Sequence, residues 1–561
     1  MHRLERAYGD FHGIANWGKV ADVELSIPAL IRHFAANHAE RDLLVFDDAR
    51  LTYTEAAARS AVFARQLLAA GVGKGGRIGM CFPNDARFIV TWLAITRIGA
   101  IAVPLSTLST AAEIRRTARH ADLQLLISAD GYLSHDYVQK AEEAFTGIGA
   151  QRAPFRLLDA PYLREVWIWG ARIPAWAKAV DVAIAPDEID AALLSAIEDQ
   201  VSPADVGTII YTSGSTADPK GVIHSQGNLM RQGAKFAVSY PYEPGYRVFA
   251  QLPYFWIGGL TTTLLNAMYT GATLLGTGAA GSALLDFLER ERVSHIIGWP
   301  HTLRAMAADP SFSKRDWTSM RGGGLVEALP ESRRPKNQIF GNSIGMTESC
   351  ASHTIAMPDY PDSLRGTLGP AMPGIEHRVL TLDGAPAAPD EVGELWLRGD
   401  VMMLGMVKRE RAEVFDSDGW YRAGDLCSIR DGHLFFHGRT DDLIKTAGSN
   451  VSPREVEQEL MALPGIAQAS VSGVPDAARG AVVGAIVVPR PGITLDPEAI
   501  RRDAAKTLAS YKVPRVLLIL EAAAIPMMSS GKPDRRALLR LLADAYQEKL
   551  QRRPREGGDP V

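Results

Sequence analysis

Cysteine is scarce in this chain of 561 residues, which has only Cys81, Cys350 and Cys427. The three lie far apart in the sequence, and no two have the C-x-x-C spacing of a metal or redox motif. Disulfide scaffolds and zinc sites need clustered cysteines, so neither is expected. The three side chains are predicted to be small, buried and apolar, in a reducing compartment.

Long apolar runs are also missing. The longest, Phe88 to Leu105, is interrupted by Arg97, Gly99 and Pro104, whereas a helix that spans a bilayer needs about 20 apolar residues. The N-terminal sequence MHRLERAYGDFHG lacks the apolar core of a secretory signal. We therefore expect no integral membrane segment and a cytoplasmic location.

Neither sign of charge predominates, because 60 basic residues face 64 acidic ones and the net charge is −4. This balance gives no electrostatic reason to expect nucleic acid as a partner. Hydrophobic residues make up 47% of the chain, which is typical of a globular protein. At about 150 residues per domain, the length predicts three or four folding units.

Helical and strand patterns alternate in the first part of the chain. Helices are predicted over Ala56–Ala70 and Phe88–Arg97, and strands over Arg77–Cys81 and Ile101–Pro104. Such alternation predicts α/β layers with largely parallel sheets.

Short β-type runs dominate later, and the pattern changes again near residue 440, where a compact α+β unit of about 100 residues begins. Its predicted elements are helices over 453–463 and 497–508 and strands over 467–474, 481–488 and 515–520. The expected domains are a large N-terminal domain (1–440), a small C-terminal domain (441–545) and a polar, disordered tail (546–561).

The strongest local motif is Tyr211–Gly221, with the sequence YTSGSTADPKG, which follows a predicted strand over Val206–Ile210. Backbone N–H groups and hydroxyls of such a loop can surround phosphate oxygens, and Lys220 adds a positive charge. The loop is not a Walker A motif, because Pro219 stands where that pattern needs glycine. A flexible surface turn would have a similar composition. The candidate phosphate ligands are Thr212, Ser213, Gly214, Ser215, Thr216 and Lys220.

These eleven residues resemble the signature of the adenylate-forming superfamily, which includes acyl-CoA synthetases, peptide-synthetase adenylation domains and beetle luciferases. Further motifs follow in the family's order, so the resemblance covers nearly the whole chain. It implies an α/β fold, in which a large N-terminal domain of layered sheets and helices is followed by a small, mobile α+β domain.

A glycine run, Gly322-Gly323-Gly324, precedes the segment Ser343-Ile344-Gly345-Met346-Thr347-Glu348. A glycine run lets a flat base approach the backbone, and a carboxylate is a hard ligand suited to Mg²⁺. The resemblance implies that the glycines, with Ser343, Ile344 and Gly345, line the adenine site. It also implies that Thr347 contacts phosphate and Glu348 binds Mg²⁺. Ile344 stands where the family usually has an aromatic residue. For an isolated Thr-Glu pair, a helix N-terminus is the alternative.

Asp425 lies in the octet GWYRAGDL, and its carboxylate suits a ribose diol, although a tight Gly-Asp turn is the alternative. The resemblance implies that Arg439 contacts the ribose or phosphate region and that Asp441 is the hinge between the domains. It also implies that the face around Lys445, Gly448 and Ser449 receives the thiol.

Lys532 lies in the sequence IPMMSSGKPDRR, and a mobile lysine there can stabilise charge on the carboxylate and α-phosphate. The resemblance implies that Lys532 catalyses adenylation, whereas an exposed basic loop is the alternative. Trp256, Ile257 and Gly258 resemble the acyl-pocket segment, for which core packing is the alternative. Because no acidic residue occurs from Gln251 to Thr263, an apolar or aromatic acid is expected rather than an amino acid.

We therefore predict an AMP-forming acid–thiol ligase that uses ATP and Mg²⁺ to make an acyl-AMP. It then transfers the acyl group from a small carboxylic acid to coenzyme A and releases AMP and pyrophosphate. Coenzyme A is favoured because the chain stops soon after Lys532. Loading of a separate carrier protein remains the main alternative, with a luciferase-type oxygenase and a non-catalytic nucleotide-binding relative as others. A homodimer is left open.

Overall fold

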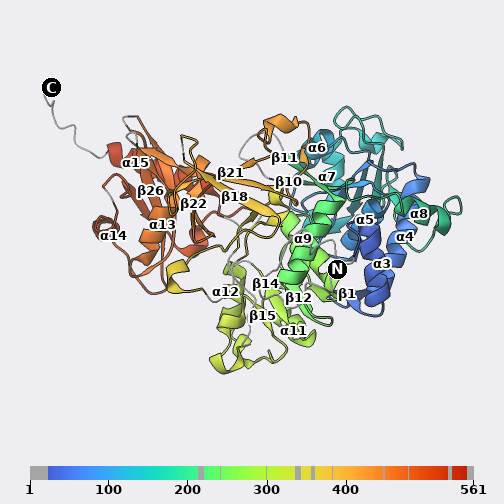
Figure 1. The fold of residues 1–561 in the computed structure, drawn as a ribbon, viewed down its shortest axis with the longest axis horizontal. Coiled ribbons are helices and arrows are strands. Elements are labelled where there is room, and N and C mark those ends of the chain that lie inside the picture. Colours follow the sequence, from blue (N-terminus) through green and yellow to red (C-terminus); the bar gives the residue numbers. More distant parts are fainter. Residues whose placement is uncertain are drawn as a thin grey trace. The chain divides into compact units, whose positions relative to one another are not determined.

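The computed structural model describes residues 23–212, 220–240, 242–298, 300–334, 343–355, 360–381, 383–446, 449–477, 479–508, 510–528 and 533–551. The chain divides into two compact units (Figure 1). The larger unit comprises 1–376 and 397–421, and the smaller comprises 377–396 and 422–561. Each is described by itself.

An eight-stranded sheet forms one layer of the larger unit. Its five pairings from β10 through β4, β3, β5 and β8 to β9 are parallel, and β11 and β20 continue the sheet antiparallel. The central strands are buried on both faces, which explains their continuous apolar sequences. In spatial order the strands are β20 (Gly405–Met406), β11 (Lys220–Ser225), β10 (Val206–Thr212), β4 (Ile101–Pro104), β3 (Arg77–Cys81), β5 (Leu125–Ala129), β8 (Glu165–Trp169) and β9 (Lys178–Ala179).

A six-stranded sheet forms a second layer, parallel except for the hairpin of β1 and β2. Its strands are β15 (Gly322–Gly323), β14 (His295–Ile297), β12 (Arg247–Ala250), β13 (Thr273–Gly276), β1 (Asp42–Phe46) and β2 (Ala49–Thr52). Four further short strands form two antiparallel pairs outside these sheets, namely β6 (Gly131–Tyr132) with β7 (His135–Asp136), and β16 (Gly345–Met346) with β17 (Ala351–Ser352).

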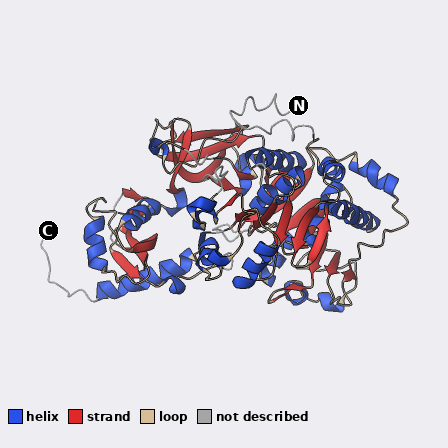
Figure 2. Ribbon diagram, turned by 90° about the horizontal axis from the view of Figure 1, so that it is seen from below, coloured by secondary structure: helices blue, strands red, loops and turns tan. Residues whose placement is uncertain are grey.

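Helices cover the sheets, and Figure 2 shows strands of the larger unit lying between helices. Side-chain caps define where several helices begin: Thr52 and Glu55 form a capping box at α4, and Asp85 accepts hydrogen bonds from the first turn of α5. The helices are α3 (Ile27–Asn37), α4 (Tyr53–Ala69), α5 (Ala86–Arg97), α6 (Ala111–His120), α7 (Tyr137–Ala144), α8 (Ala191–Glu198), α9 (Gln226–Ser239), η2 (Gly259–Leu265), α10 (Asn266–Thr270), α11 (Ser282–Arg290) and α12 (Pro300–Ala308).

Two sheets organise the smaller unit. Most residues of the first, ordered β18 (Ile375–Leu380), β19 (Gly393–Gly399), β21 (Tyr421–Arg430) and β22 (His433–Arg439), belong to this unit. The second contains β24 (Ser449–Val451), β23 (Ile444–Thr446), β26 (Gly480–Pro489), β25 (Ile466–Asp476) and β27 (Val516–Ile519), the last paired with β26.

Strand β26 is buried on both faces, so alternate residues join different cores. Val483, Ala485 and Val487 pack in the core with helices α13 (Pro453–Ala462) and α14 (Pro497–Ala504). Val482 and Ile486 pack in the core with helix α15 (Arg535–Gln551). The sheet is therefore a central layer with helices on each side.

The predicted fold class is confirmed: both units combine helices with sheets, and the large N-terminal part precedes a smaller one. The three cysteines are buried and unbridged, as predicted. In the described part of the chain, no helix is long and apolar enough to cross a membrane. The domain boundary expected at residue 440 separates two domains that are predicted to move relative to one another. This boundary stays a prediction.

Two boundaries differ from those predicted. The helix predicted to reach Leu508 ends at Ala504, because the next residues form turns that return the chain toward β27. The predicted tail starts at residue 546, but α15 continues to Gln551. Leu538, Leu542 and Tyr546 recur every four residues on one helix face and are buried against the sheet, which keeps this stretch helical.

Candidate functional site

Thr347 and Glu348 lie in a short 3₁₀ turn, Thr347–Ser349, in the larger unit. Two elements hold the backbone of this turn. His224 on β11 donates from Nε2 to the Thr347 carbonyl over 2.8 Å, and the Met403 amide donates to the Glu348 carbonyl over 2.8 Å. The turn is therefore fixed from β11 and from the segment that precedes β20.

Burial makes His224 a neutral hydrogen-bond donor. Its side chain is fully buried, and desolvation lowers its pKa to about 4. The donation to the Thr347 carbonyl places the ring hydrogen on Nε2. His224 thus acts on the turn through a hydrogen bond without adding charge beside a candidate phosphate site.

The Glu348 carboxylate is half-buried, and its Oε1 accepts a hydrogen bond of 3.1 Å from the Tyr421 hydroxyl. Within the described residues, no group of three or more His, Cys, Asp or Glu side chains could hold a metal by itself. Mg²⁺ is commonly bound by one or two carboxylates together with substrate phosphates. Glu348 fits a Mg²⁺ ion held jointly with a nucleotide.

The glycine run forms a strand edge without side chains. Gly323 has a φ of +100°, and a Cβ there would collide with the Ile296 carbonyl oxygen. A Cβ on Gly322 would lie 2.8 Å from the His295 ring. The Gly324 amide donates to the Ile296 carbonyl over 2.9 Å. Gly322 and Gly323 are thus buried closely against β14, Gly324 is exposed, and the contact of this run with an adenine base stays a prediction.

Ile344 and Gly345 lie just before the Thr347–Ser349 turn. The Ile344 amide donates to Thr354 Oγ1 over 3.0 Å, and Gly345 pairs with Ser352 across the β16–β17 hairpin. Ser343 is exposed, and its Oγ lies 3.3 Å from that of Ser352. The backbone at the predicted adenine-lining residues is thus continuous with the turn of Glu348.

The phosphate loop joins β10 and β11. Thr212 and Lys220 face each other as the last antiparallel pair before it, so a hairpin holds both ends of the loop. The predicted ligands Ser213, Gly214, Ser215 and Thr216 lie outside the described residues.

The predicted ribose ligands lie together in the smaller unit. Asp425 and Arg439 are opposite each other on β21 and β22. Arg439 Nη1 lies 2.9 Å from Asp425 Oδ1, and the Asp425 residue is only 3% exposed. Such a buried carboxylate is costly without a partner. The arginine supplies that partner, and half of its side chain stays exposed.

Asp441 lies in the 3₁₀ turn Thr440–Asp442, immediately after β22. Lys445 is exposed on β23, and Ser449 pairs with Thr446 at the start of β24. Gly448 and Lys532 lie outside the described residues.

The predicted acyl-pocket segment leads into an unusual helix. Trp256 is half-buried and packs against Phe255 with ring centroids 5.4 Å apart, whereas Ile257 is 5% exposed. Among the described residues, no atom outside the adjoining backbone and chain neighbours lies within 4 Å of a Cβ built on Gly258. The next residues form the π-helix η2, and π-helical turns occur frequently at functional sites.

Comparison with known families identifies both parts of the chain. Residues 31–407 match the model of the AMP-binding enzyme family, and residues 455–532 match that of the AMP-binding enzyme C-terminal domain. The chain belongs to the AMP-binding enzyme family.

Relatives and solved structures agree with this membership. The chain is 29% identical over 532 residues to a sulfoacetate–CoA ligase of Cupriavidus necator, with 92% of this chain and 97% of the relative covered. It is 32% identical to a feruloyl-CoA synthase of an Amycolatopsis species, with coverage of 86% and 92%. An anthranilate CoA ligase structure with anthranoyl-AMP matches with a TM-score of 0.75, 21% identity and coverage of 94% and 100%. The amide bond synthetase McbA of Marinactinospora thermotolerans matches with a TM-score of 0.76, 24% identity and coverage of 92% and 99%.

Membership of this AMP-binding family confirms the predicted superfamily and the prediction of an AMP-forming acid–thiol ligase. The roles predicted for individual residues stay predictions. Two residues with a place in the site had no predicted role, Tyr421 and His224. Tyr421 lies inside the octet with Asp425, but its contact with Glu348 joins residues 73 positions apart and leaves no local pattern.

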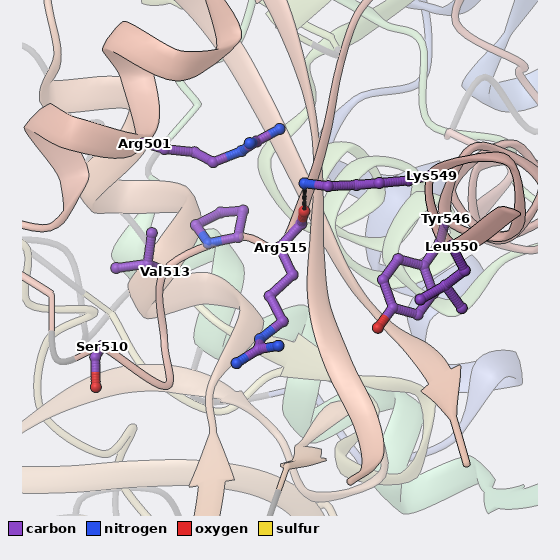
Figure 3. Close-up of a pocket in the computed structure, with 8 residues that line it drawn as sticks. Arg501, Ser510, Val513, Arg515, Tyr546, Lys549 and Leu550 are labelled. Carbon is purple, nitrogen blue, oxygen red and sulfur yellow. Dashed lines mark hydrogen bonds between the residues drawn. The ribbon is translucent and has the colours of Figure 1, made fainter. Parts of the chain in front are cut away.

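A basic pocket in the smaller unit of this AMP-binding enzyme was also not predicted (Figure 3). Its volume is about 230 Å³, and none of its eight lining residues is acidic. Figure 3 shows the Arg501 guanidinium and the Lys549 ammonium directed toward one another, and Lys549 Nζ donates to the Arg515 carbonyl over 2.9 Å. The lining residues are Arg501, Ser510, Val513, Pro514, Arg515, Tyr546, Lys549 and Leu550.

Proposed function

We propose that this enzyme activates an apolar or aromatic carboxylic acid as its acyl-AMP and transfers the acyl group to coenzyme A. The observation that supports it best is the turn of Thr347 and Glu348. Hydrogen bonds from His224 and Met403 fix its backbone, and the Glu348 carboxylate remains partly exposed. A rigid polar turn of this kind suits electrostatic stabilisation of a reacting phosphate.

In the proposed first step, a carboxylate oxygen of the acid forms a bond to the α-phosphorus of ATP. The bond from that phosphorus to the bridging oxygen breaks, and pyrophosphate leaves. Lys532, Thr347 and Lys220 would stabilise the developing negative charge. Glu348 would hold Mg²⁺ against the phosphates, where the ion supplies countercharge to the leaving group.

In the proposed second step, the thiolate of coenzyme A attacks the acyl carbonyl carbon. A C–S bond forms, the bond to the AMP oxygen breaks, and AMP leaves. The thiol proton passes to solvent earlier, when the thiolate forms. The face around Lys445, Gly448 and Ser449 would receive the thiol. Because Lys532 and this face serve different steps, the smaller domain would turn about Asp441 between them.

The basic pocket supports coenzyme A as the acceptor. Coenzyme A has a 3′-phosphate and a diphosphate, and Arg515 and Lys549 offer positive charge with no acidic side chain lining the pocket, while the third cation, Arg501, is paired with Glu498 outside the lining. We expect Lys549→Gln to raise the KM for coenzyme A several-fold and that for dephospho-coenzyme A much less. Lys506→Gln, a change to an exposed lysine paired with Asp503 outside the pocket, is the matched control.

Two features support an apolar or aromatic acid. The space beside Gly258 is open, so the segment offers room, and the buried Ile257 beside it is apolar. No carboxylate between Gln251 and Thr263 could pair with the ammonium group of an amino acid. Trp256, directly before Ile257, is half-buried and would shape the entrance to the acyl site.

The test is a panel of fatty, aromatic and polycyclic acids with ATP and Mg²⁺, with and without coenzyme A. Pyrophosphate release and the acyl products are followed by mass spectrometry. We expect pyrophosphate with at least one apolar or aromatic acid and a thioester when coenzyme A is present. Acyl-AMP that never reaches coenzyme A would instead support loading of a carrier protein, and no turnover on a broad panel would support a nucleotide-binding protein without activity.

Lys532→Ala tests whether Lys532 acts in acyl-AMP formation and not in thioester formation. We expect it to lower acyl-AMP formation by at least about 100-fold, by analogy with the loss of one oxyanion-stabilising donor. Thioester formation from supplied acyl-AMP should change far less. Equal losses in the two half-reactions would contradict the role proposed for Lys532.

A further inference from the structure

The Glu348 carboxylate is supported by a side chain that has no role in the proposal above. The Tyr421 hydroxyl donates to Glu348 Oε1 over 3.1 Å. Oε1 is thereby partly engaged, whereas Oε2 accepts no hydrogen bond recorded among the described residues. A carboxylate held by one oxygen keeps the other for a metal ion in a defined direction.

The Tyr421 ring is itself held in place. Tyr421 packs against the core of Val222, Met403, Met406 and Phe415, and its ring lies 6.0 Å from that of Phe415 in an edge-to-face arrangement. A backbone bridge also pairs Phe415 with Tyr421. The hydroxyl therefore projects from a packed side chain rather than from a freely rotating one.

The same small core supports Glu348 from its backbone side. Met403 is 2% exposed in that core, and its amide donates to the Glu348 carbonyl. The segment of Met403 is anchored in turn by α9, since Asn228 Nδ2 donates to the Met402 carbonyl over 2.6 Å. The same hydrophobic core thus orients both the backbone and the carboxylate of Glu348.

We propose that Tyr421 is a positioning residue for the metal at this site: its hydroxyl orients Glu348 so that Mg²⁺ and the nucleotide bind to a preformed ligand. This inference rests on the proposed function, in which Glu348 holds Mg²⁺. Glutamate has several rotatable bonds, and binding that must first order such a side chain is weaker. Groups that hydrogen-bond to metal ligands typically account for a 10- to 100-fold change in metal affinity.

The test is Tyr421→Phe in the full chain, which removes the hydroxyl and keeps the ring in its core. Tyr162→Phe is the matched control, because that tyrosine is 56% exposed in the same unit. Binding of Mn²⁺ in the presence of a non-hydrolysable ATP analogue is followed by electron paramagnetic resonance. We expect about 10-fold weaker Mn²⁺ binding for Tyr421→Phe, and no change for Tyr162→Phe.

Kinetics separate positioning from general damage. In acyl-AMP formation, Tyr421→Phe should raise the Mg²⁺ concentration for half-maximal rate by about the same factor, with a smaller effect on the rate at saturating Mg²⁺. Adding Tyr421→Phe to Glu348→Gln should then cause little further weakening, because the two residues act as a unit. Thermal unfolding of each variant checks that the packed core is intact.

The outcomes distinguish the two proposals. If the wild-type enzyme makes no acyl-AMP from any acid, the proposed function fails. If the wild type is active but Mn²⁺ affinity is unchanged in Tyr421→Phe, the positioning role is overturned. Additive effects of Tyr421→Phe and Glu348→Gln on Mn²⁺ binding would overturn it as well, because they would mean that Tyr421 acts other than through Glu348.

Discussion

At Gly323 the backbone has a φ of +100°, and a Cβ would collide with the Ile296 carbonyl oxygen on the neighbouring strand. Both effects oppose a side chain at this position. L-residues rarely adopt that conformation, and a backbone carbonyl cannot move aside as a flexible side chain could. We expect Gly323→Ala to distort the β14–β15 pairing and to weaken ATP binding at least about 10-fold, with a lower midpoint of thermal unfolding.

Gly149→Ala is the control for this glycine. In the part of the chain that the structure describes, no atom beyond its chain neighbours lies within 4 Å of a Cβ built on Gly149, and its φ is not in the left-handed region. The variant should bind ATP and unfold as the wild type does. Calorimetric titration with ATP checks both variants, and unchanged ATP affinity in Gly323→Ala would separate this glycine from the adenine site.

Single residues also show where sequence and structure diverge. Asp425 and Arg439 were predicted separately as nucleotide contacts, and the β21–β22 hairpin pairs them directly. Their pairing could not be predicted, because it depends on strand register rather than on either motif. Tyr421 was overlooked for the same kind of reason, since a hydroxyl–carboxylate contact between distant residues has no sequence pattern.

At the scale of an element, α9 shows how a helix can be buried and polar at once. Lys235 is 2% exposed, and its Nζ lies 2.7 Å from Asp400 Oδ1. Desolvation lowers the pKa of Lys235 to about 7 and raises that of Asp400 to about 7. Two neighbouring groups also act on the pKa of Lys235: Arg231 on α9 lowers it, and Cys350, next to the Thr347–Ser349 turn, raises it.

We expect Lys235→Met to destabilise the protein by about 3 kcal/mol near pH 8, because it removes the ammonium group that lies 2.7 Å from the largely buried Asp400 carboxylate. The loss should be smaller at pH 5.5. Asp400 has a raised pKa in the folded state, so the folded variant retains a proton that the unfolded chain releases above about pH 4. The contribution of that proton to the free energy of unfolding is fully present below about pH 4. It is lost as the pH rises through about 7.

Thermal unfolding of Lys235→Met and wild type at pH 5.5 and pH 8 measures this difference. The double variant Lys235→Met/Asp400→Asn is the control, since it also removes the negative charge of Asp400 and should recover most of the stability at pH 8. An equal deficit at both pH values would contradict the account based on Asp400.

The elements themselves were predicted best where the pattern is local. Strands β3 and β4 begin and end where their apolar runs do, because flanking glycines and prolines bound them. Helix α14 was predicted four residues too long, since its last apolar positions belong to turns that pack against the same core. The basic pocket was not predicted because its cations come from α14, α15 and the segment before β27.

At the scale of the whole molecule, the proposed reaction needs two arrangements of the same chain, one for each step. Asp441 lies in the 3₁₀ turn Thr440–Asp442 between β22 and β23. Proline at this position would fix one φ angle and restrict the conformation of Thr440 before it. A residue that absorbs a dihedral change at a hinge cannot tolerate that restriction without cost to the motion.

We therefore expect Asp441→Pro to affect the two half-reactions unequally, with the step that needs the less favoured arrangement slowed at least about 10-fold and the other much less. Asp441→Ala keeps backbone freedom and removes only the carboxylate, so it should resemble the wild type in both steps. Single-turnover assays of acyl-AMP formation, and of thioester formation from supplied acyl-AMP, measure the two rates. If Asp441→Ala is as slow as Asp441→Pro, the carboxylate rather than the backbone matters here. If neither variant separates the half-reactions, the movement takes place at another residue, because a hinge must show its restriction in at least one of the two steps.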